Sequence, residues 1–281
     1  SLFLLNVTAP ANLLESKANE LVQWEFTSSD DSDLGLTFAQ PQILQMNDGN
    51  WYVVSPNGYN SSSGRAAMFF LPVDARTSWT SSNYKKMVVE QATAANGLSD
   101  FSYYDLNKDG KVDLIYAGDL KGNIWRFNVS SSDTSKWTAS SIFVATGPDG
   151  KVQPVVLAPQ LSLHPTLSLS RSATAPNLVL TFAGGKFLEA CDKDSAGCSG
   201  ESTTRSMYSI WDFGGYICNR SELGVVGVEH FPDTMPKTRH VFDYDSKGYP
   251  GSGVSNAAVA CTTSGSRTLS SADGKSTYSL S

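Results

Sequence analysis

Residues 111–138 read KVDLIYAGDLKGNIWRFNVSSSDTSKWT, an apolar stretch, a glycine turn and an aromatic stretch that closes on Asn. The same unit occurs earlier as NWYVVSPNGYN (50–60) with AMFFLPVDARTSWT (67–80), and later as NLVLTFAGGKF (177–187) with SMYSIWDF (206–213). The equivalent glycines, Gly58, Gly118 and Gly184, lie 60 and 66 residues apart. A spacing of this size fits a repeated four-stranded unit.

This repeat predicts an all-β protein, a modified β-propeller, because a propeller buries aromatic strand faces between successive blades and therefore repeats one unit. The competing interpretation is that glycine commonly follows an apolar run in any β protein. Helical periodicity is confined to Ala9–Phe26 and Lys85–Ala95. We expect one domain over 1–281, with a lead-in over 1–34, recognisable blades over 35–213 and a less regular, disulfide-bearing part over 214–281.

Composition narrows the class of protein. The chain has 281 residues, 21 Lys+Arg against 27 Asp+Glu and a net charge of −6, which argues against a nucleic-acid surface. No apolar run approaches the roughly 18 residues that a transmembrane helix needs. The first residues, Ser1–Leu5, lack the charged start and cleavage site of a secretory signal, so we interpret the chain as a fragment or mature piece of something longer.

The cysteines all lie in the last third of the sequence, at Cys191, Cys198, Cys218 and Cys261. None belongs to a CxxC pair, and an even number at loop spacing favours disulfides in an oxidising compartment over a metal site. The favoured pairing is Cys191 with Cys198 and Cys218 with Cys261. All three connectivities are compatible with the sequence alone.

The strongest chemical motif is DLNKDGKVD, residues 105–113. Its predicted ligands for one hard cation are Asp105, Asn107, Asp109, the carbonyl of Lys111, and Asp113. Oxygen side chains at the first, third, fifth and ninth positions, with a glycine at the sixth for the sharp turn, are typical of a Ca²⁺ loop. Mg²⁺ fits less well, because it prefers several waters and strict octahedral geometry.

The twelfth position of this motif is Tyr116, where an EF-hand has a bidentate Glu. Both flanks, Phe101–Tyr104 and Val112–Tyr116, have strand character, so we predict a calcium loop in a β-hairpin. The alternative is an Asp/Asn-rich turn that binds nothing. Other acidic clusters, such as Asp30, Asp31 and Asp33, lack the spacing and are interpreted as solvated loops.

The stretches YYDLNKDGKVDLIYAGDLKGNIWRFNV (103–129) and GLTFAQPQILQMNDGNWYVVSPNGYNSSSGRAAMFFLPVD (35–74) strongly resemble the C-terminal propeller of the PilY1/PilC proteins of bacterial type IV pili. The resemblance covers roughly Gly35 to Asp212. It implies a protein that supports pilus biogenesis, opposes retraction and contributes to twitching motility, host-cell adhesion and virulence. It also implies Ca²⁺ on the loop, minor pilins and a host-cell surface as partners, and a location at the pilus tip or outer membrane.

Two other classes of function share features with this sequence. GDLKGNIWRF (118–127) is also similar to repeats of quinoprotein dehydrogenases that hold pyrroloquinoline quinone beside Ca²⁺, but those enzymes need vicinal cysteines, which this chain lacks. A carbohydrate-binding module could stack sugars on Trp79 or Trp137, although their repeated position favours blade packing. We therefore expect a protein that is not an enzyme, with Trp51, Trp125 and Trp211 in the core.

Overall fold

The computed structural model describes residues 1–75, 78–90, 95–164, 167–193, 197–215, 267–270 and 277–280. Within these ranges the strands are β1 (Leu2–Leu5), β2 (Val22–Phe26), β3 (Gln42–Gln45), β4 (Trp51–Pro56), β5 (Ala66–Pro72), β6 (Lys85–Glu90), β7 (Leu98–Tyr104), β8 (Leu114–Asp119), β9 (Asn123–Asn128), β10 (Thr138–Val144), β11 (Gln160–Leu163), β12 (Leu178–Ala183), β13 (Met207–Asp212), β14 (Arg267–Ser270) and β15 (Thr277–Leu280). The helical pieces are short: α1 (Ala18–Leu21) and the 3-10 turns Pro10–Asn12, Glu15–Lys17, Thr134–Lys136 and Ala190–Lys193.

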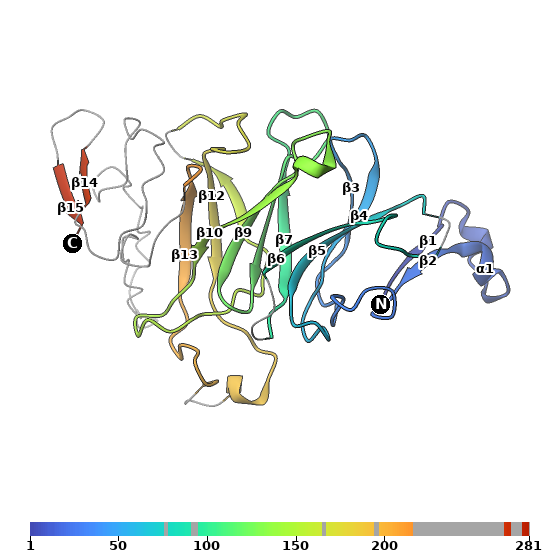
Figure 1. Ribbon diagram of the computed structural model, residues 1–281, viewed down its shortest axis with the longest axis horizontal. Coiled ribbons are helices and arrows are strands. Elements are labelled where there is room, and N and C mark those ends of the chain that lie inside the picture. Colours follow the sequence, from blue (N-terminus) through green and yellow to red (C-terminus); the bar gives the residue numbers. More distant parts are fainter. Residues whose placement is uncertain are drawn as a thin grey trace, which may run out of the picture.

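The strands form antiparallel sheets in which neighbours in sequence are neighbours in space. Blade 1 has the order β3-β4-β5-β6, blade 2 the order β7-β8-β9-β10, and the described part of blade 3 the order β11-β12-β13. Figure 1 shows these blades side by side, with the β1–β2 hairpin beyond blade 1. The second strand of each blade, β4, β8 or β12, comes from the repeated unit, so the repeat read from the sequence is confirmed as a blade.

Two of the repeated glycines lie directly against the backbone of another segment of the chain. A Cβ atom added to Gly118 would lie 2.5 Å from the carbonyl oxygen of Val155, and one added to Gly58 would lie 2.0 Å from that of Leu36. Gly58 also has a backbone φ of +69°, which residues other than glycine rarely adopt. A larger residue at either position would push the two backbones apart.

Aromatic side chains fill the spaces between blades. The ring centroid of Phe70 in blade 1 lies 5.0 Å from that of Trp137, which directly precedes β10 of blade 2 and is only 6 % exposed. Between blades 2 and 3, the ring of Phe143 lies 5.4 Å from that of Tyr208. Trp79 is half-buried and packs 5.2 Å from Phe26. Trp79 and Trp137 therefore pack in the blades, as their repeated position predicted.

The prediction that Trp51 belongs to the core is wrong, since this side chain is 51 % exposed. It lies at the first position of β4, beside the exposed Gly49 and Asn50, while the next residue, Tyr52, faces the core and is 8 % exposed. Alternate residues of a strand point to opposite faces, so the two rings cannot both be inside. Trp125 is half-buried against the core shared by blades 1 and 2.

The helical periodicity of Lys85–Ala95 is also misleading. Lys85–Glu90 is strand β6, which pairs with β5, while 91–94 lie outside the described residues. The Ala9–Phe26 region forms only short helical turns before strand β2. The helical pattern does not produce a long helix in either region, because pairing to a neighbouring strand buries more apolar surface than an isolated helical turn can.

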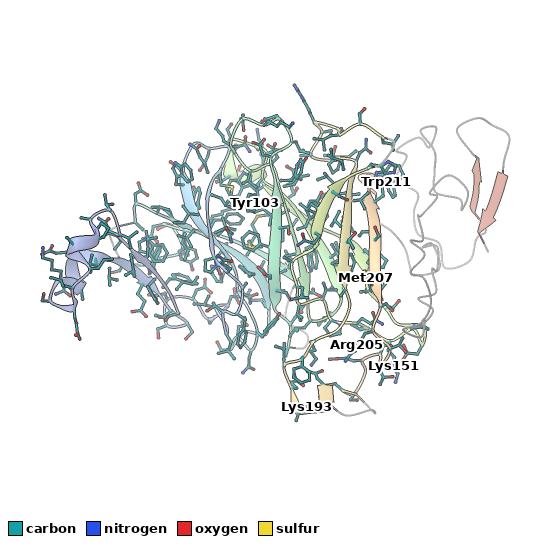
Figure 2. The ribbon with its side chains drawn as sticks, turned by 180° about the vertical axis from the view of Figure 1, so that it is seen from behind. Tyr103, Lys151, Lys193, Arg205, Met207 and Trp211 are labelled. Carbon is teal, nitrogen blue, oxygen red and sulfur yellow. A yellow bond between two sulfur atoms is a disulfide. The ribbon has the colours of Figure 1, made fainter. Side chains whose placement is uncertain are left out.

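Figure 2 shows the outer strand of blade 3 with its side chains, Met207 near one end and Trp211 near the other. Met207 is 79 % exposed, whereas Trp211 packs between the rings of His164 and Phe213, at centroid distances of 5.0 and 5.3 Å. Trp211 is therefore half-buried.

Candidate metal centre

The predicted metal loop, residues 105–113, connects β7 to β8 within blade 2, which confirms that it lies in a β-hairpin. Tyr104 and Leu114 pair across its base, and the Asp113 N–H donates to the Tyr104 carbonyl oxygen at 3.0 Å. Leu106 turns inward and is 3 % exposed. The two strands and this apolar anchor fix both ends of the loop.

The predicted ligand side chains shape the loop through their own hydrogen bonds. Asp105 Oδ2 accepts from the Gly110 N–H at 2.8 Å, and Asn107 Oδ1 accepts from the Asp109 N–H at 2.8 Å. Asp109 Oδ1 in turn accepts from the Lys111 N–H at 3.0 Å. The bonds to Asn107 and Asp109 are Asx turns, in which a short polar side chain replaces a backbone acceptor, whereas Asp105 accepts from across the loop. The loop is therefore curled by the same residues that would hold the cation.

Two residues at the tip of the loop have left-handed backbone. Lys108 has a φ of 63° and Gly110 a φ of 87°. Glycine adopts this conformation without steric cost, which explains its place at the sixth position of the motif. An alanine at 110 would meet no heavy atom within 4 Å, so strain there comes from the backbone alone.

Asp113, the last predicted ligand, differs from the others because it is buried, at 4 % exposure. Its Oδ2 accepts from the Leu106 N–H at 2.8 Å, and its Oδ1 accepts from Asn47 Nδ2 of blade 1 at 3.1 Å. Both oxygens are thus held in place before any ligand is considered.

The donor set fits Ca²⁺ in its chemistry. It offers hard oxygens only, and a carboxylate with two oxygens has about four acceptor sites, so even Asp105, which accepts from the N–H groups of Lys108, Asp109 and Gly110, retains a site for a metal bond. The ammonium of Lys111 lies 3.7 Å from Asp109 Oδ2, an exposed pair that a divalent cation would outcompete.

The structure gathers the predicted ligands on one loop but does not close them into a tight cluster. Among the described residues, the groups of acidic and cysteine ligand atoms that lie within 4.8 Å of one another are Glu189–Cys191–Cys198 and Asp192–Cys198–Glu201. Asp105, Asp109 and Asp113 do not form such a group, because each carboxylate turns toward N–H donors and like charges repel.

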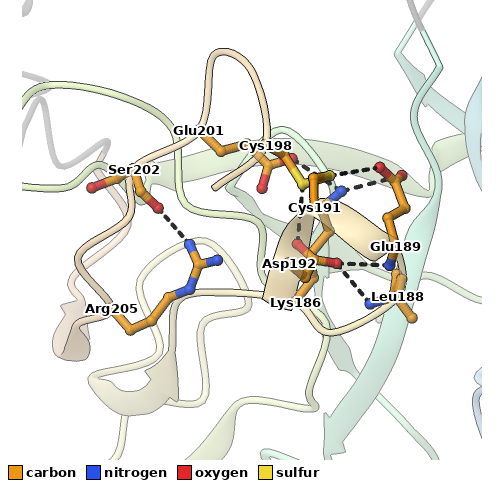
Figure 3. The surroundings of a disulfide bond; sticks show 9 residues. All are labelled: Lys186, Leu188, Glu189, Cys191, Asp192, Cys198, Glu201, Ser202 and Arg205. Carbon is orange, nitrogen blue, oxygen red and sulfur yellow. Dashed lines mark hydrogen bonds and ion pairs between the residues drawn. A yellow bond between two sulfur atoms is a disulfide. The ribbon is translucent and has the colours of Figure 1, made fainter. Parts of the chain in front are cut away.

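The second acidic region surrounds a disulfide, shown in Figure 3. Cys191 and Cys198 are bonded, with an S–S distance of 2.02 Å, which confirms that predicted pair; Cys218 and Cys261 lie outside the described residues. Lys186 lies 3.2 Å from Glu189 and 3.1 Å from Glu201. Because disulfide sulfurs are not thiolates, this arrangement is a cross-linked turn with its charges paired.

Asp119, in the AGDLKGN stretch (117–123), organises blade 2. It is fully buried, and its Oδ2 accepts from Asn96 Nδ2, Asn123 Nδ2 and Trp125 Nε1 at 2.8–3.0 Å. Its Oδ1 accepts from the N–H groups of Lys121 and Asn123, both at 2.9 Å. Burial raises the pKa of Asp119, and the hydrogen bonds from Trp125 and the two asparagines lower it in part. Asp119 therefore holds the turn between β8 and β9 in place.

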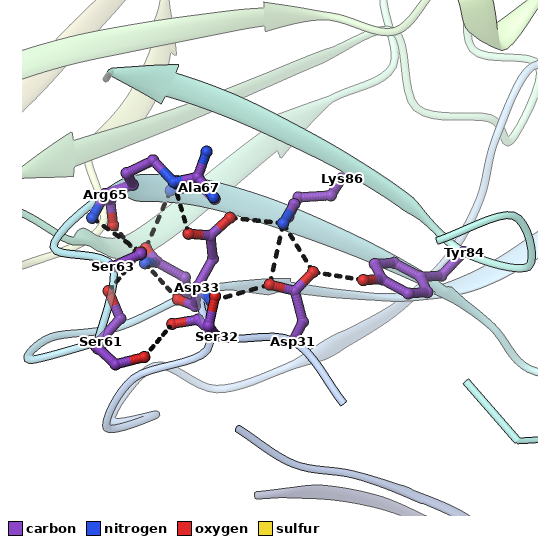
Figure 4. Close-up of polar contacts among 11 residues, drawn as sticks. Asp31, Ser32, Asp33, Ser61, Ser63, Arg65, Ala67, Tyr84 and Lys86 are labelled. Atoms are coloured by element: carbon purple, nitrogen blue, oxygen red, sulfur yellow. Dashed lines mark hydrogen bonds and ion pairs between the residues drawn. The ribbon is translucent and has the colours of Figure 1, made fainter. Parts of the chain in front are cut away.

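A buried charge network was missed by the sequence interpretation, which placed Asp31 and Asp33 in solvated loops. They are 8 % and 0 % exposed, and Lys86 Nζ contacts Asp31 Oδ2 at 2.7 Å and Asp33 Oδ2 at 2.5 Å. Tyr84 also donates to Asp31, and Arg65 Nε contacts Asp33 Oδ1 at 2.8 Å (Figure 4). We call these five residues the latch, because they fasten the lead-in to blade 1.

Hydrogen bonds from the latch and from Ser63 favour the ionised form of the Asp33 carboxyl. Burial alone would raise the pKa of this carboxyl, but the hydrogen bonds from Lys86, Ser63 and Arg65 outweigh burial and hold its pKa below the ordinary value. The partners are at least 30 residues away in sequence, at positions 63, 65 and 86, so no local pattern could have revealed them.

The sheet order and the repeated unit together define a β-propeller domain. The chain belongs to the PilY1 family, since residues 11–217 match the family model described as the PilY1 beta-propeller domain. This membership confirms the resemblance read from the sequence. Within the described residues, no helix is both long and apolar enough to span a membrane.

Relatives and a solved structure agree with this assignment. A type IV pilus biogenesis factor PilY1 homolog of Xylella fastidiosa is 30 % identical over 272 residues, covering 88 % of this chain and 17 % of that protein. Type IV pilus biogenesis factor PilY1 of Pseudomonas aeruginosa PAO1 is 30 % identical over 232 residues, covering 75 % of this chain and 18 % of the relative. The crystal structure of the Pseudomonas aeruginosa PilY1 C-terminal domain matches with a TM-score of 0.60 and 29 % identity, over 74 % of this chain and 42 % of that one.

Proposed function

We propose that this chain is the calcium-binding propeller module of a type IV pilus-associated protein. Its role is to support pilus biogenesis, control of retraction, twitching motility and host-cell adhesion, without enzymatic activity. The observation that carries the calcium assignment is the 105–113 loop, which sets five oxygen ligands at the spacing of a calcium loop between two paired strands. The names of the relatives support the link to pilus biogenesis.

Asp105, Asn107, Asp109, the Lys111 carbonyl and Asp113 would hold the ion. A bound Ca²⁺ would supply positive charge to a loop that carries three carboxylates, and would cross-link its exposed tip to the buried Asp113. The ion would then add a cross-link to the hydrogen bonds that shape the loop, and the surface of blade 2 would change with it.

An extracytoplasmic position, at the cell surface, the pilus tip or the outer membrane, fits both features of the site. The Cys191–Cys198 disulfide is of the kind that persists in oxidising compartments. An exposed loop with three carboxylates is expected to bind Ca²⁺ in roughly the micromolar to millimolar range, filled outside the cell and nearly empty at cytosolic calcium. The partners we propose are minor pilins and, in adhesion, the host-cell surface.

The test compares two substitutions of one ligand in cells that carry the full-length protein. Asp109→Ala removes a ligand, whereas Asp109→Lys places an ammonium group where the cation would be. Because the second mimics the bound charge and the first does not, we expect different pilus phenotypes, with fewer surface pili in one variant under conditions that permit retraction. Asp74→Ala, at an exposed aspartate outside the loop, is the matched control.

The readouts are surface pilin and twitching motility. Different phenotypes of the two Asp109 variants, with Asp74→Ala like wild type, would support a calcium switch. If both Asp109 variants behave as wild type while calorimetry shows that calcium binding is lost, the metal is a structural cross-link only and the switch is wrong.

A further inference from the structure

The metal loop of blade 2 is in direct contact with blade 1, through Asn47. This residue lies in the turn between β3 and β4, and its Nδ2 donates to the Val112 carbonyl oxygen at 2.9 Å, to Asp113 Oδ1 at 3.1 Å and to the Val129 carbonyl oxygen at 3.3 Å. One amide group of blade 1 thus reaches the end of the loop and the end of β9. The last predicted ligand, Asp113, is one of its acceptors.

The same turn also makes backbone and apolar contacts with blade 2. Met46 forms a parallel bridge with Val112, and the Val112 N–H donates to the Gln45 carbonyl oxygen at 3.0 Å. Met46, Val112 and Val129 belong to one buried cluster, with exposures of 0 %, 4 % and 0 %. The β3–β4 turn is therefore docked firmly beside the loop, so that its position and that of Asp113 are linked.

Asn47 fixes the direction of the Asp113 carboxylate. The Leu106 N–H holds Oδ2 at 2.8 Å from inside the loop, and Asn47 holds Oδ1 at 3.1 Å from the neighbouring blade. A carboxylate held at both oxygens cannot rotate, yet each oxygen retains an acceptor site. Partners of this kind orient a metal ligand and reduce the entropy that binding must overcome.

We propose that Asn47 is a positioning residue for the metal loop, so that cation binding by blade 2 and docking of the β3–β4 turn of blade 1 stabilise each other. The proposal rests on the proposed calcium function of residues 105–113. Coupling between two sites is reciprocal: if the docked turn favours binding, binding must favour the docked turn by the same factor. The loop then controls the junction of two blades as well as its own order.

The first test is calorimetric titration of the chain with CaCl₂. Asn47→Ala removes the donor to Asp113, and we expect its calcium affinity to fall by about tenfold, the effect typical of losing a partner that orients a metal ligand. Asn47→Leu keeps a branched side chain of similar size but has no donor to Asp113, so affinity should fall by about the same factor as in Asn47→Ala. Asn50→Ala changes the same residue type in the same turn, where the Asn50 side chain donates to Asp48 rather than to the metal loop, and should bind as wild type.

The second readout is amide hydrogen exchange in the turn, which lies outside the loop. The Gly49 N–H donates to the Met46 carbonyl oxygen at 2.9 Å, and calcium should slow its exchange in wild type but not in Asn47→Ala. Asn47 variants that bind calcium as tightly as wild type, with the same slowing at Gly49, would overturn the positioning role while leaving the calcium site intact. Wild type that binds no calcium would overturn the proposed function and this proposal together.

Discussion

Replacing Lys86 with methionine tests whether the latch holds the lead-in to blade 1. The ammonium group contacts both oxygens of Asp31, at 2.7 and 3.0 Å, and Asp33 Oδ2 at 2.5 Å. Methionine preserves most of the length and apolar volume of the side chain, so the substitution removes the charge with little change in packing. Two buried carboxylates then lose their shared cation.

The loss of stability in Lys86→Met depends on the contacts that the two aspartates keep. Removing one partner of a buried ion pair costs about 3–5 kcal/mol. Asp33 keeps Arg65 Nε at 2.8 Å, and Asp31 keeps the Tyr84 hydroxyl, so the lower end of that range applies. We expect a decrease of about 3 kcal/mol in the free energy of unfolding, which corresponds to a Tm lower by roughly 6–12 °C.

The assay is urea unfolding followed by tryptophan fluorescence. Lys85→Met is the matched control, because Lys85 is the adjacent residue of β6 and faces away from the two aspartates; it should change stability by less than about 0.5 kcal/mol. The double variant Lys86→Met with Asp33→Asn should recover part of the loss, since one stranded charge is gone. If Lys86→Met is as stable as Lys85→Met, the latch contributes nothing and the reasoning fails.

Three further outcomes are expected. Replacing Cys191 and Cys198 together by serine should lower the free energy of unfolding by about 2.5 kcal/mol, the loop-closure value for so short a loop; equal urea midpoints would contradict this. Gly118→Ala should cost about 1–3 kcal/mol by the same assay, because its Cβ would lie 2.5 Å from the Val155 carbonyl oxygen; unchanged stability would refute the close approach. Because the pKa of Asp33 is lower in the folded protein than its ordinary value of 3.8, the ionised carboxyl contributes stability above pH 3.8, and this contribution is lost as the pH falls through the lowered pKa. Asp33→Asn should therefore flatten the dependence of the unfolding free energy on pH in this acid range.

The blades could be predicted from the sequence because their cause is local and repeated. Apolar strands, a turn and a glycine recur at fixed spacing, and the structure places Gly118 and Gly184 at equivalent points of blades 2 and 3. The 105–113 loop could be placed in a hairpin for the same reason, since its shape depends on Asx turns within nine residues.

What the sequence could not reveal depends on distant partners. Asp31 looks like a solvated loop residue until Lys86, 55 positions later, is brought beside it. Asn47 lies in an ordinary turn, and only the packing of blade 1 on blade 2 puts its amide 3.1 Å from Asp113, 66 positions away. Trp51 was misplaced because aromatic character favours burial but does not say on which side of a strand end a ring lies.

The central claim is that residues 105–113 bind calcium, and calorimetric titration of wild type and Asp109→Ala with CaCl₂ tests it most directly. We predict one site in wild type with a Kd in the micromolar to millimolar range, and a strong loss of affinity in Asp109→Ala without unfolding, because the loop lies between two strands that pair independently of it. Wild type that releases or absorbs no heat with calcium, or Asp109→Ala that binds as tightly as wild type, would contradict the assignment.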